Sequence, residues 1–145
     1  MLHRAGDREE ARNRLVALWE EAGPHGDPLH RCTVAHYVAG TQDDPWDALR
    51  WDQRALAVAR GGQPDGLGRI PSGRCAETGT DVQLRAFIPS LHLSLAAAYT
   101  TLHHPVEARR ELRQARQAAT VLTDGPYGQG VREAIALLER RLDAG

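Results

Sequence analysis

The 145-residue sequence contains no lysine, so arginine supplies all 18 of its Lys-plus-Arg side chains. Its 19 acidic residues bring the formal net charge to −1. Binding to nucleic acid or to a membrane surface needs a clear excess of positive charge, so we expect neither partner. The use of arginine alone, together with many alanines and glycines, indicates a high-GC bacterial genome.

Long hydrophobic runs and clustered cysteines are also missing. No apolar stretch approaches the roughly 18 residues that a membrane span needs, and the N-terminal segment is charged. The two cysteines, Cys32 and Cys75, lie far apart and outside any CxxC spacing, which excludes a zinc ribbon or a thioredoxin-like motif. We therefore expect reduced thiols in a cytoplasmic protein, and the sequence carries no cofactor fingerprint.

Large apolar side chains are scarce too, because the chain has one phenylalanine and one methionine. Leucine, alanine and valine must build the core, with three tryptophans and three tyrosines. A chain of 145 residues is long enough for such a core and typical of a single domain, which we assign to residues 1–145.

Apolar residues recur at helical spacing along most of the sequence, which predicts an all-α fold of about six helices without strands. Asp27-Pro28 and Asp44-Pro45 each combine a good N-cap with proline at the first helical position. Thr80 and Gln83 match a capping box. The expected helices are residues 7–21, 29–39, 45–60, 80–102, 104–119 and 127–142. Residues 61–79, rich in glycine and proline, predict a loop that is either a mobile insertion or a lid over a site.

The clearest local pattern lies in residues 90–119, where two helices fold back on each other through a turn at His103-His104-Pro105. Alanines in both helices let their backbones approach closely, while leucine and tyrosine fill the space beside them. In the first helix a leucine, an alanine and a tyrosine lie at i, i+1 and i+4. In the second helix an alanine, a leucine and an alanine lie at i, i+4 and i+7. These residues are Leu95, Ala96 and Tyr99, followed by Ala108, Leu112 and Ala115.

This spacing resembles the tetratricopeptide repeat, a family of helical hairpins of about 34 residues. Leu95-Ala96 and Tyr99 stand at the family's Leu-Gly pair and tyrosine, whereas His92 stands where the family prefers tryptophan and Thr120 lies near the expected proline. Residues 29–60 resemble a second, degenerate repeat. The resemblance implies a short right-handed superhelix of antiparallel hairpins, with a concave groove lined by the first helix of each hairpin.

Asp52 is the most informative single residue. It shares one helical row with Ala48, Ala55 and Ala59, and the matching position in the next hairpin is Leu112. The pattern thus places a carboxylate on a face that should be dry, where a charge needs a partner. The candidate partners are His36, His92 and Arg85. Two interpretations follow: a polar contact that holds two hairpins in register, or a carboxylate in a binding or catalytic groove.

Other side chains are expected near the same groove. His92 shares a helical face with Tyr99, and His36 occupies the equivalent place one hairpin earlier. Trp51 is either a core residue or an aromatic rim of the groove. His36, Asp52 and His92 together suggest a two-histidine, one-carboxylate metal site or an acid–base pair as an alternative.

Three hypotheses for function follow. The first is a binding module whose groove takes a peptide, a protein or a small molecule, with polar and aromatic contacts from His36, Trp51, Asp52, Arg85, His92 and Tyr99. The second is a small enzyme or metal protein on the same scaffold, which uses Asp52 with His36 or His92. The third is a structural partner or a homodimer formed through a terminal helix. The sequence does not decide whether the chain is an enzyme.

Overall fold

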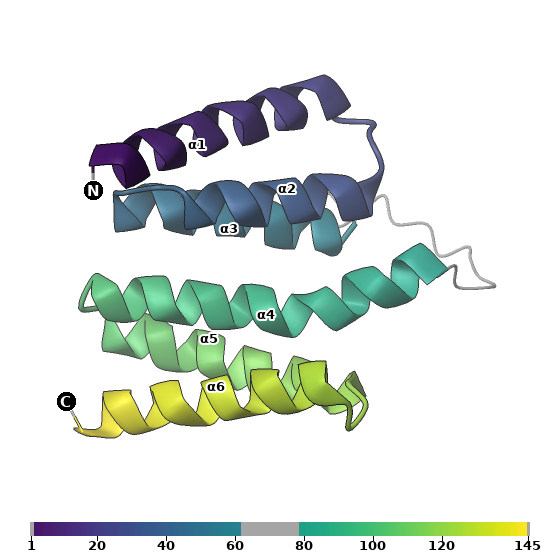
Figure 1. Cartoon of the computed structure of the whole chain (residues 1–145). Coiled ribbons are helices and arrows are strands. Elements are labelled where there is room, and N and C mark those ends of the chain that lie inside the picture. Colours follow the sequence, from purple (N-terminus) through teal and green to yellow (C-terminus); the bar gives the residue numbers. More distant parts are fainter. Residues whose placement is uncertain (1, 62–78, 145) are drawn as a thin grey trace.

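The computed structural model describes residues 2–61 and 79–144, and within them the protein consists of stacked helices (Figure 1). No β-strand occurs in these residues, which confirms the prediction of an all-α fold with six helices. The predicted loop at 61–79 falls almost entirely on residues outside the described ranges, and so does Cys75. The six α-helices are α1 Leu2–Ala22, α2 Pro28–Gly40, α3 Pro45–Ala59, α4 Gly79–Thr101, α5 Pro105–Ala118 and α6 Pro126–Ala144.

Two Asp-Pro pairs begin helices α2 and α3 as the sequence predicts. The Asp27 carboxylate accepts a hydrogen bond of 3.0 Å from the backbone N–H of His30, and Asp44 accepts one of 2.9 Å from that of Trp46. Each proline occupies the first helical turn, where a backbone N–H has no intrahelical acceptor. These caps fix where α2 and α3 begin, and the hairpin formed by these two helices carries the candidate site.

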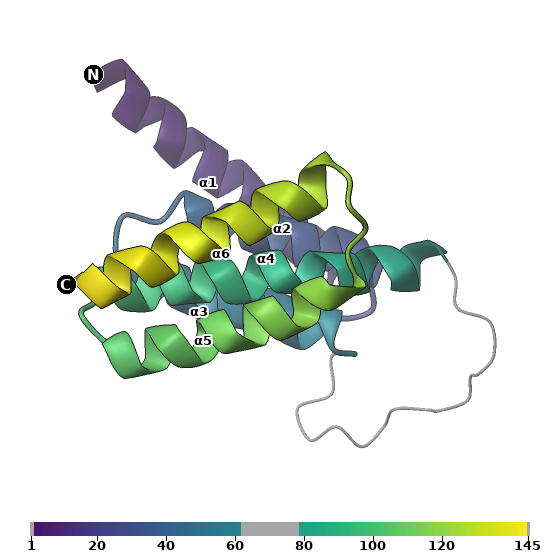
Figure 2. The same ribbon diagram turned by 90° about the horizontal axis from the view of Figure 1, so that it is seen from below.

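The helices form two hairpins and two covering helices. Hairpin α2–α3 stacks on hairpin α4–α5 through contacts of α4 with both α2 and α3. Helix α1 packs against α2, and α6 packs against α4 and α5 at the other end of the stack (Figures 1 and 2). Figure 2 shows the N-terminal part of α1 extending away from the other helices.

The core has two parts, one on each side of α4. The first is formed by α2, α3 and α4 and contains Cys32, Ala35, Leu49, Ala55, Leu56, Val58, Leu84, Leu91 and Leu95. The second is formed by α4, α5, α6 and the short 3-10 helix η2 (Ala119–Val121), and it contains Ala96, Leu112, Ala115, Ala119, Val131, Ile135 and Leu138. The alanines predicted to let helices approach are fully buried, which confirms that part of the hairpin pattern.

Helix α4 departs from the sequence prediction at its start. It begins at Gly79, so Thr80 lies inside the first turn and the boundary expected from the capping box is wrong by at least one residue. Pro89 lies within the helix, where it removes one backbone donor, and the ribbon of α4 changes direction along its length (Figure 1).

The turn between α4 and α5 closes through backbone hydrogen bonds. The His104 N–H donates to the Tyr99 carbonyl over 2.8 Å, and the His103 N–H donates to that of Thr100 over 3.0 Å. This is the pattern of a Schellman motif, and it requires the left-handed conformation seen at His103, whose φ is 63°. His104 is the N-cap residue of α5, but its side chain makes no capping hydrogen bond, and its ring lies against those of Trp46 and Tyr99.

We expect His103→Gly to raise the free energy of unfolding by about 0.5–1 kcal/mol, because glycine adopts a positive φ without the steric cost of a Cβ atom. The gain stays small because glycine also increases the conformational entropy of the unfolded chain. Urea unfolding monitored by circular dichroism measures the change. A loss of stability would contradict the backbone conformation assigned to this turn.

Candidate functional site

Asp52 is buried in helix α3, as its helical row predicts. Its relative exposure is 2%, equal to that of Leu112, the residue at the matching position of the next hairpin. Ala55 is fully buried beside it in the same row. The first hairpin therefore places a carboxylate where the second hairpin places a leucine, and the surroundings must supply hydrogen-bond donors to that carboxylate.

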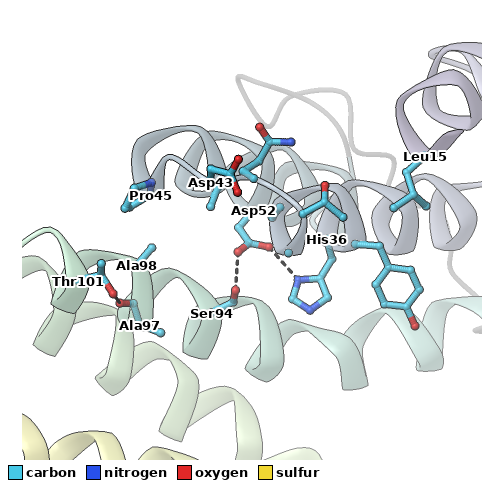
Figure 3. Close-up of a pocket in the computed structure, with 15 residues that line it drawn as sticks. Leu15, His36, Asp43, Pro45, Asp52, Ser94, Ala97, Ala98 and Thr101 are labelled. Carbon is cyan, nitrogen blue, oxygen red and sulfur yellow. Dashed lines mark hydrogen bonds and ion pairs between the residues drawn. The ribbon is translucent and has the colours of Figure 1, made fainter. Parts of the chain in front are cut away.

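Two neighbouring helices supply these donors (Figure 3). His36 of α2 places its Nδ1 2.8 Å from Oδ1 of Asp52. Ser94 of α4 donates its hydroxyl to Oδ2 of the same carboxylate. Both oxygens of Asp52 thus have a partner, and this cluster, which we call the Asp52 cluster, joins the two stacked hairpins.

The Asp52 cluster fixes which nitrogen of His36 carries the proton. An ionised carboxylate can only accept, so Nδ1 must be the donor. When the ring is neutral, Nε2 is then left as an acceptor. Among the described residues Nε2 has no hydrogen-bond partner, and the side chain is 25% exposed. His36 therefore presents an oriented lone pair to its surroundings.

The three side-chain types are those of a serine-hydrolase triad, but their order is different. In such a triad histidine lies between serine and aspartate, so that it can take the serine proton. Here Asp52 lies in the middle and accepts from both Ser94 and His36. No hydrogen bond joins Ser94 to the ring of His36 among the described residues, so the arrangement does not activate this serine as a nucleophile.

A pocket with a volume of about 620 Å³ lies at the Asp52 cluster, within the range of small-ligand sites. Helices α1 to α4 and the α2–α3 turn all contribute to it (Figure 3). The floor along α4 is built from small side chains that follow one another at helical spacing. The lining residues are Leu15, His36, Tyr37, Ala39, Gly40, Thr41, Gln42, Asp43, Pro45, Ala48, Asp52, Ser94, Ala97, Ala98 and Thr101.

Cys32 lies one helical turn before His36 on α2 and is completely buried. Burial, and then the nearby negative charge of Asp52, raise the pKa of the Cys32 thiol to about 12. Both effects disfavour the thiolate, which is the nucleophilic form. Cys32 is therefore a packing residue behind the Asp52 cluster.

We expect the thiol of Cys32 to resist alkylation in the folded protein at pH 8, because a thiol with a pKa of about 12 stays protonated there. In a Cys75→Ser background, iodoacetamide should label Cys32 only as fast as the protein opens, and rapidly in denaturing urea. Mass spectrometry over time measures both rates. Rapid labelling of the folded protein would contradict the burial of this thiol.

His92 does not face Asp52 as the sequence predicted. It is 3% exposed and lies on another side of α4, between α3 and α5. Its Nδ1 is 2.7 Å from Oε1 of Glu111, and its Nε2 is 3.1 Å from Nη2 of Arg60. Both ring nitrogens are occupied, so His92 serves the packing of three helices and not the pocket.

The alternative metal site of His36, Asp52 and His92 is consequently wrong. Within residues 2–61 and 79–144, no three His, Cys, Asp or Glu side chains lie where they could hold a metal ion. The reason is the direction of His92: at the level of Asp52, α4 presents Ser94 instead.

The remaining predicted contacts lie away from the pocket lining. The Trp51 ring packs edge-on against Trp19, with 5.5 Å between ring centroids. Tyr99 packs against the first part of the core, and its ring faces His104. Arg85 is exposed on α4. Of the six predicted side chains, the pocket brings together His36 and Asp52.

Sequence reasoning missed Ser94, although a signal for it exists. Ser94, Ala97, Ala98 and Thr101 recur at i, i+3, i+4 and i+7, so they form one narrow face of α4 with no large side chain. Such a face either meets another helix closely or borders a pocket. The structure shows the second outcome at this end of α4.

Comparisons with known proteins add no identification. No protein-family model matches the chain, and no curated protein or solved structure shows significant similarity to it. Among the described helices, none has a stretch apolar enough and long enough to cross a bilayer. Function must therefore be inferred from the pocket itself.

Proposed function

We propose that the chain is a binding module, built as a short stack of tetratricopeptide-like hairpins, whose pocket between α2 and α4 takes a small molecule or a short segment of a peptide or protein. The repeated hairpin pattern supports the architecture, because Ala55 of the first hairpin and Ala108 and Ala115 of the second are all fully buried. The pocket lies on the side to which both first helices of the hairpins contribute.

The observation that carries this proposal is the polar cluster at a leucine position. A buried carboxylate contributes less to stability than a well-packed leucine, unless its partners compensate for the lost hydration. Asp52 has such partners, and one of them, His36, lines the pocket and has a second ring nitrogen without a hydrogen-bond partner among the described residues. A contact that only held the hairpins in register would not need a pocket beside it.

A second candidate is an enzyme in which His36 acts as a general base. A carboxylate that orients Nδ1–H and leaves Nε2 free is the arrangement that acid–base catalysis uses. The same atom would accept a hydrogen bond from a bound ligand in the first proposal. Turnover of a ligand that binds the pocket, abolished in His36→Asn, would favour the enzyme over the binding module.

We expect His36→Asn to keep the fold and to weaken ligand binding at least tenfold. The asparagine amide nitrogen occupies roughly the place of Nδ1, so it can still donate to Asp52, whereas Nε2 is lost. The probes are six-carbon aliphatic compounds ending in an amine, an alcohol or a carboxylate, titrated into ¹⁵N-labelled protein. Shifted amide resonances at His36, Ser94 and Ala97 locate the site.

His30→Asn is the matched control, because His30 lies exposed on the same helix and outside the lining of the pocket. It should bind every probe as the wild type does. The proposal fails if no probe shifts the pocket resonances, or if His36→Asn binds with unchanged affinity.

A further inference from the structure

The two carboxylates in the lining of the pocket differ in how their charges are balanced. Asp43 and Asp52 belong to its lining, and no arginine does so among the described residues. At the rim, Asp43 is balanced by α1, since Arg8 lies 2.7 Å from one carboxylate oxygen and Arg12 lies 4.0 Å from the other. At the base, Asp52 has two neutral donors when His36 is uncharged, so its negative charge stays uncompensated.

Three of the hydroxyl groups that line the pocket donate their protons to other groups of the protein. Ser94 donates to Asp52, Thr41 donates to the Val38 carbonyl over 2.7 Å, and Thr101 donates to the Ala97 carbonyl over 3.1 Å. His36 offers the lone pair of Nε2. These hydroxyl oxygens and Nε2 can therefore only accept a hydrogen bond from a ligand, whereas the Tyr37 hydroxyl and the second amide N–H of Gln42 can still donate.

Two further features match a cation on a short aliphatic chain. The exposed ring of Tyr37 belongs to the pocket lining, and its centroid lies 6.2 Å from that of the His36 ring. A tyrosine ring can attract a cation that is placed over its face. Ala97, Ala98 and Pro45 provide an apolar wall for the methylene groups.

From this arrangement we infer that the pocket recognises a protonated primary amine, whose N–H donates to Nε2 of His36 and whose charge is attracted by Asp52 behind the ring. The inference rests on the proposed function, because it names the ligand class of the same pocket. The ammonium belongs either to a free alkylamine or to the side chain of a lysine in a peptide. A carboxylate ligand would meet the charge of Asp52 and find no donor at His36.

The experiment compares n-hexylamine, hexanol and hexanoate, which share one carbon chain, by NMR titration of the wild type at constant ionic strength. Charge-assisted hydrogen bonds are about twice as strong as neutral ones, so hexylamine should bind about tenfold more tightly than hexanol, and hexanoate most weakly. Asp52→Asn should reduce this preference for the amine, because it removes the negative charge behind the ring. His36→Asn should remove it, and His30→Asn should retain it.

Titration with two lysine derivatives identifies the source of the ammonium. Nα-acetyl-lysine methylamide and its Nε-acetylated form differ in one charge, and binding of the first alone shows that a peptide lysine can enter. Weak binding of both with strong binding of hexylamine assigns the pocket to free amines. If hexanoate binds as tightly as hexylamine, the inference is wrong while the binding module stands. If none of the probes shifts the pocket resonances, both proposals are wrong.

Discussion

Replacing His36 by alanine is expected to lower the free energy of unfolding by about 2–4 kcal/mol, although a quarter of the side chain is exposed (25%). The cost arises at Asp52, which is 2% exposed and, within the described part of the chain, would retain Ser94 as its single donor. A buried carboxylate that loses a donor forfeits the interaction that replaced its hydration. Chemical denaturation of both proteins measures the difference.

His36→Asn is the matched variant for this prediction, because it removes most of the ring and keeps a donor for Asp52. We expect it to cost about 1 kcal/mol or less, since one hydrogen bond is preserved and a partly exposed ring is truncated. Equal losses in the two variants would show that the ring acts through packing alone, for instance on Phe87, which lies edge-on at 5.3 Å.

Gly128→Ala is expected to destabilise the protein by about 2–4 kcal/mol, within the range for overpacking in a rigid site. A Cβ atom at this position would lie 2.2 Å from the carbonyl oxygen of Thr123 and 3.3 Å from Cβ of Leu122. The clashing oxygen belongs to the backbone of the turn before α6, so no side-chain rotation relieves it. Thermal and urea unfolding measure the loss.

Gly130→Ala provides the control two residues further along the same helix. Apart from its chain neighbours and the backbone of α6 itself, nothing lies within 4 Å of a Cβ placed there, so alanine should stabilise α6 by about 0.5–1 kcal/mol through its higher helix propensity. We predict that the two substitutions change the free energy of unfolding in opposite directions: Gly128→Ala lowers it, and Gly130→Ala raises it. If both variants gain stability, the close approach of α6 to the preceding turn is not present in solution.

Local signals in the sequence were sufficient for most of the fold. Aspartate followed by proline marks the starts of α2 and α3, and the buried alanines mark where helices meet. Gly128 shows what such signals leave out, because glycine is required there by the close approach of the Thr123 carbonyl, a contact that no local pattern indicates.

The site was predicted only in part for a similar reason. Asp52 could be identified because one helical row fixes its face, and His36 lies opposite it in the same hairpin. The partner from the second hairpin depends on the rotation of α4 about its axis. Residues two apart on a helix point to nearly opposite sides, so choosing His92 instead of Ser94 selected the wrong side of α4.

The tautomer of His36 tests the central claim most directly. Long-range ¹H–¹⁵N correlation spectra of the ¹⁵N-labelled protein, recorded where the ring is neutral, report which ring nitrogen carries the proton. Comparison with His36→Asn assigns the signals of this ring among the seven histidines. We predict a protonated Nδ1 and an unprotonated Nε2. A ring protonated at Nε2, or one that exchanges freely between the two forms, would contradict the hydrogen bond to Asp52 and the acceptor in the pocket that depends on it.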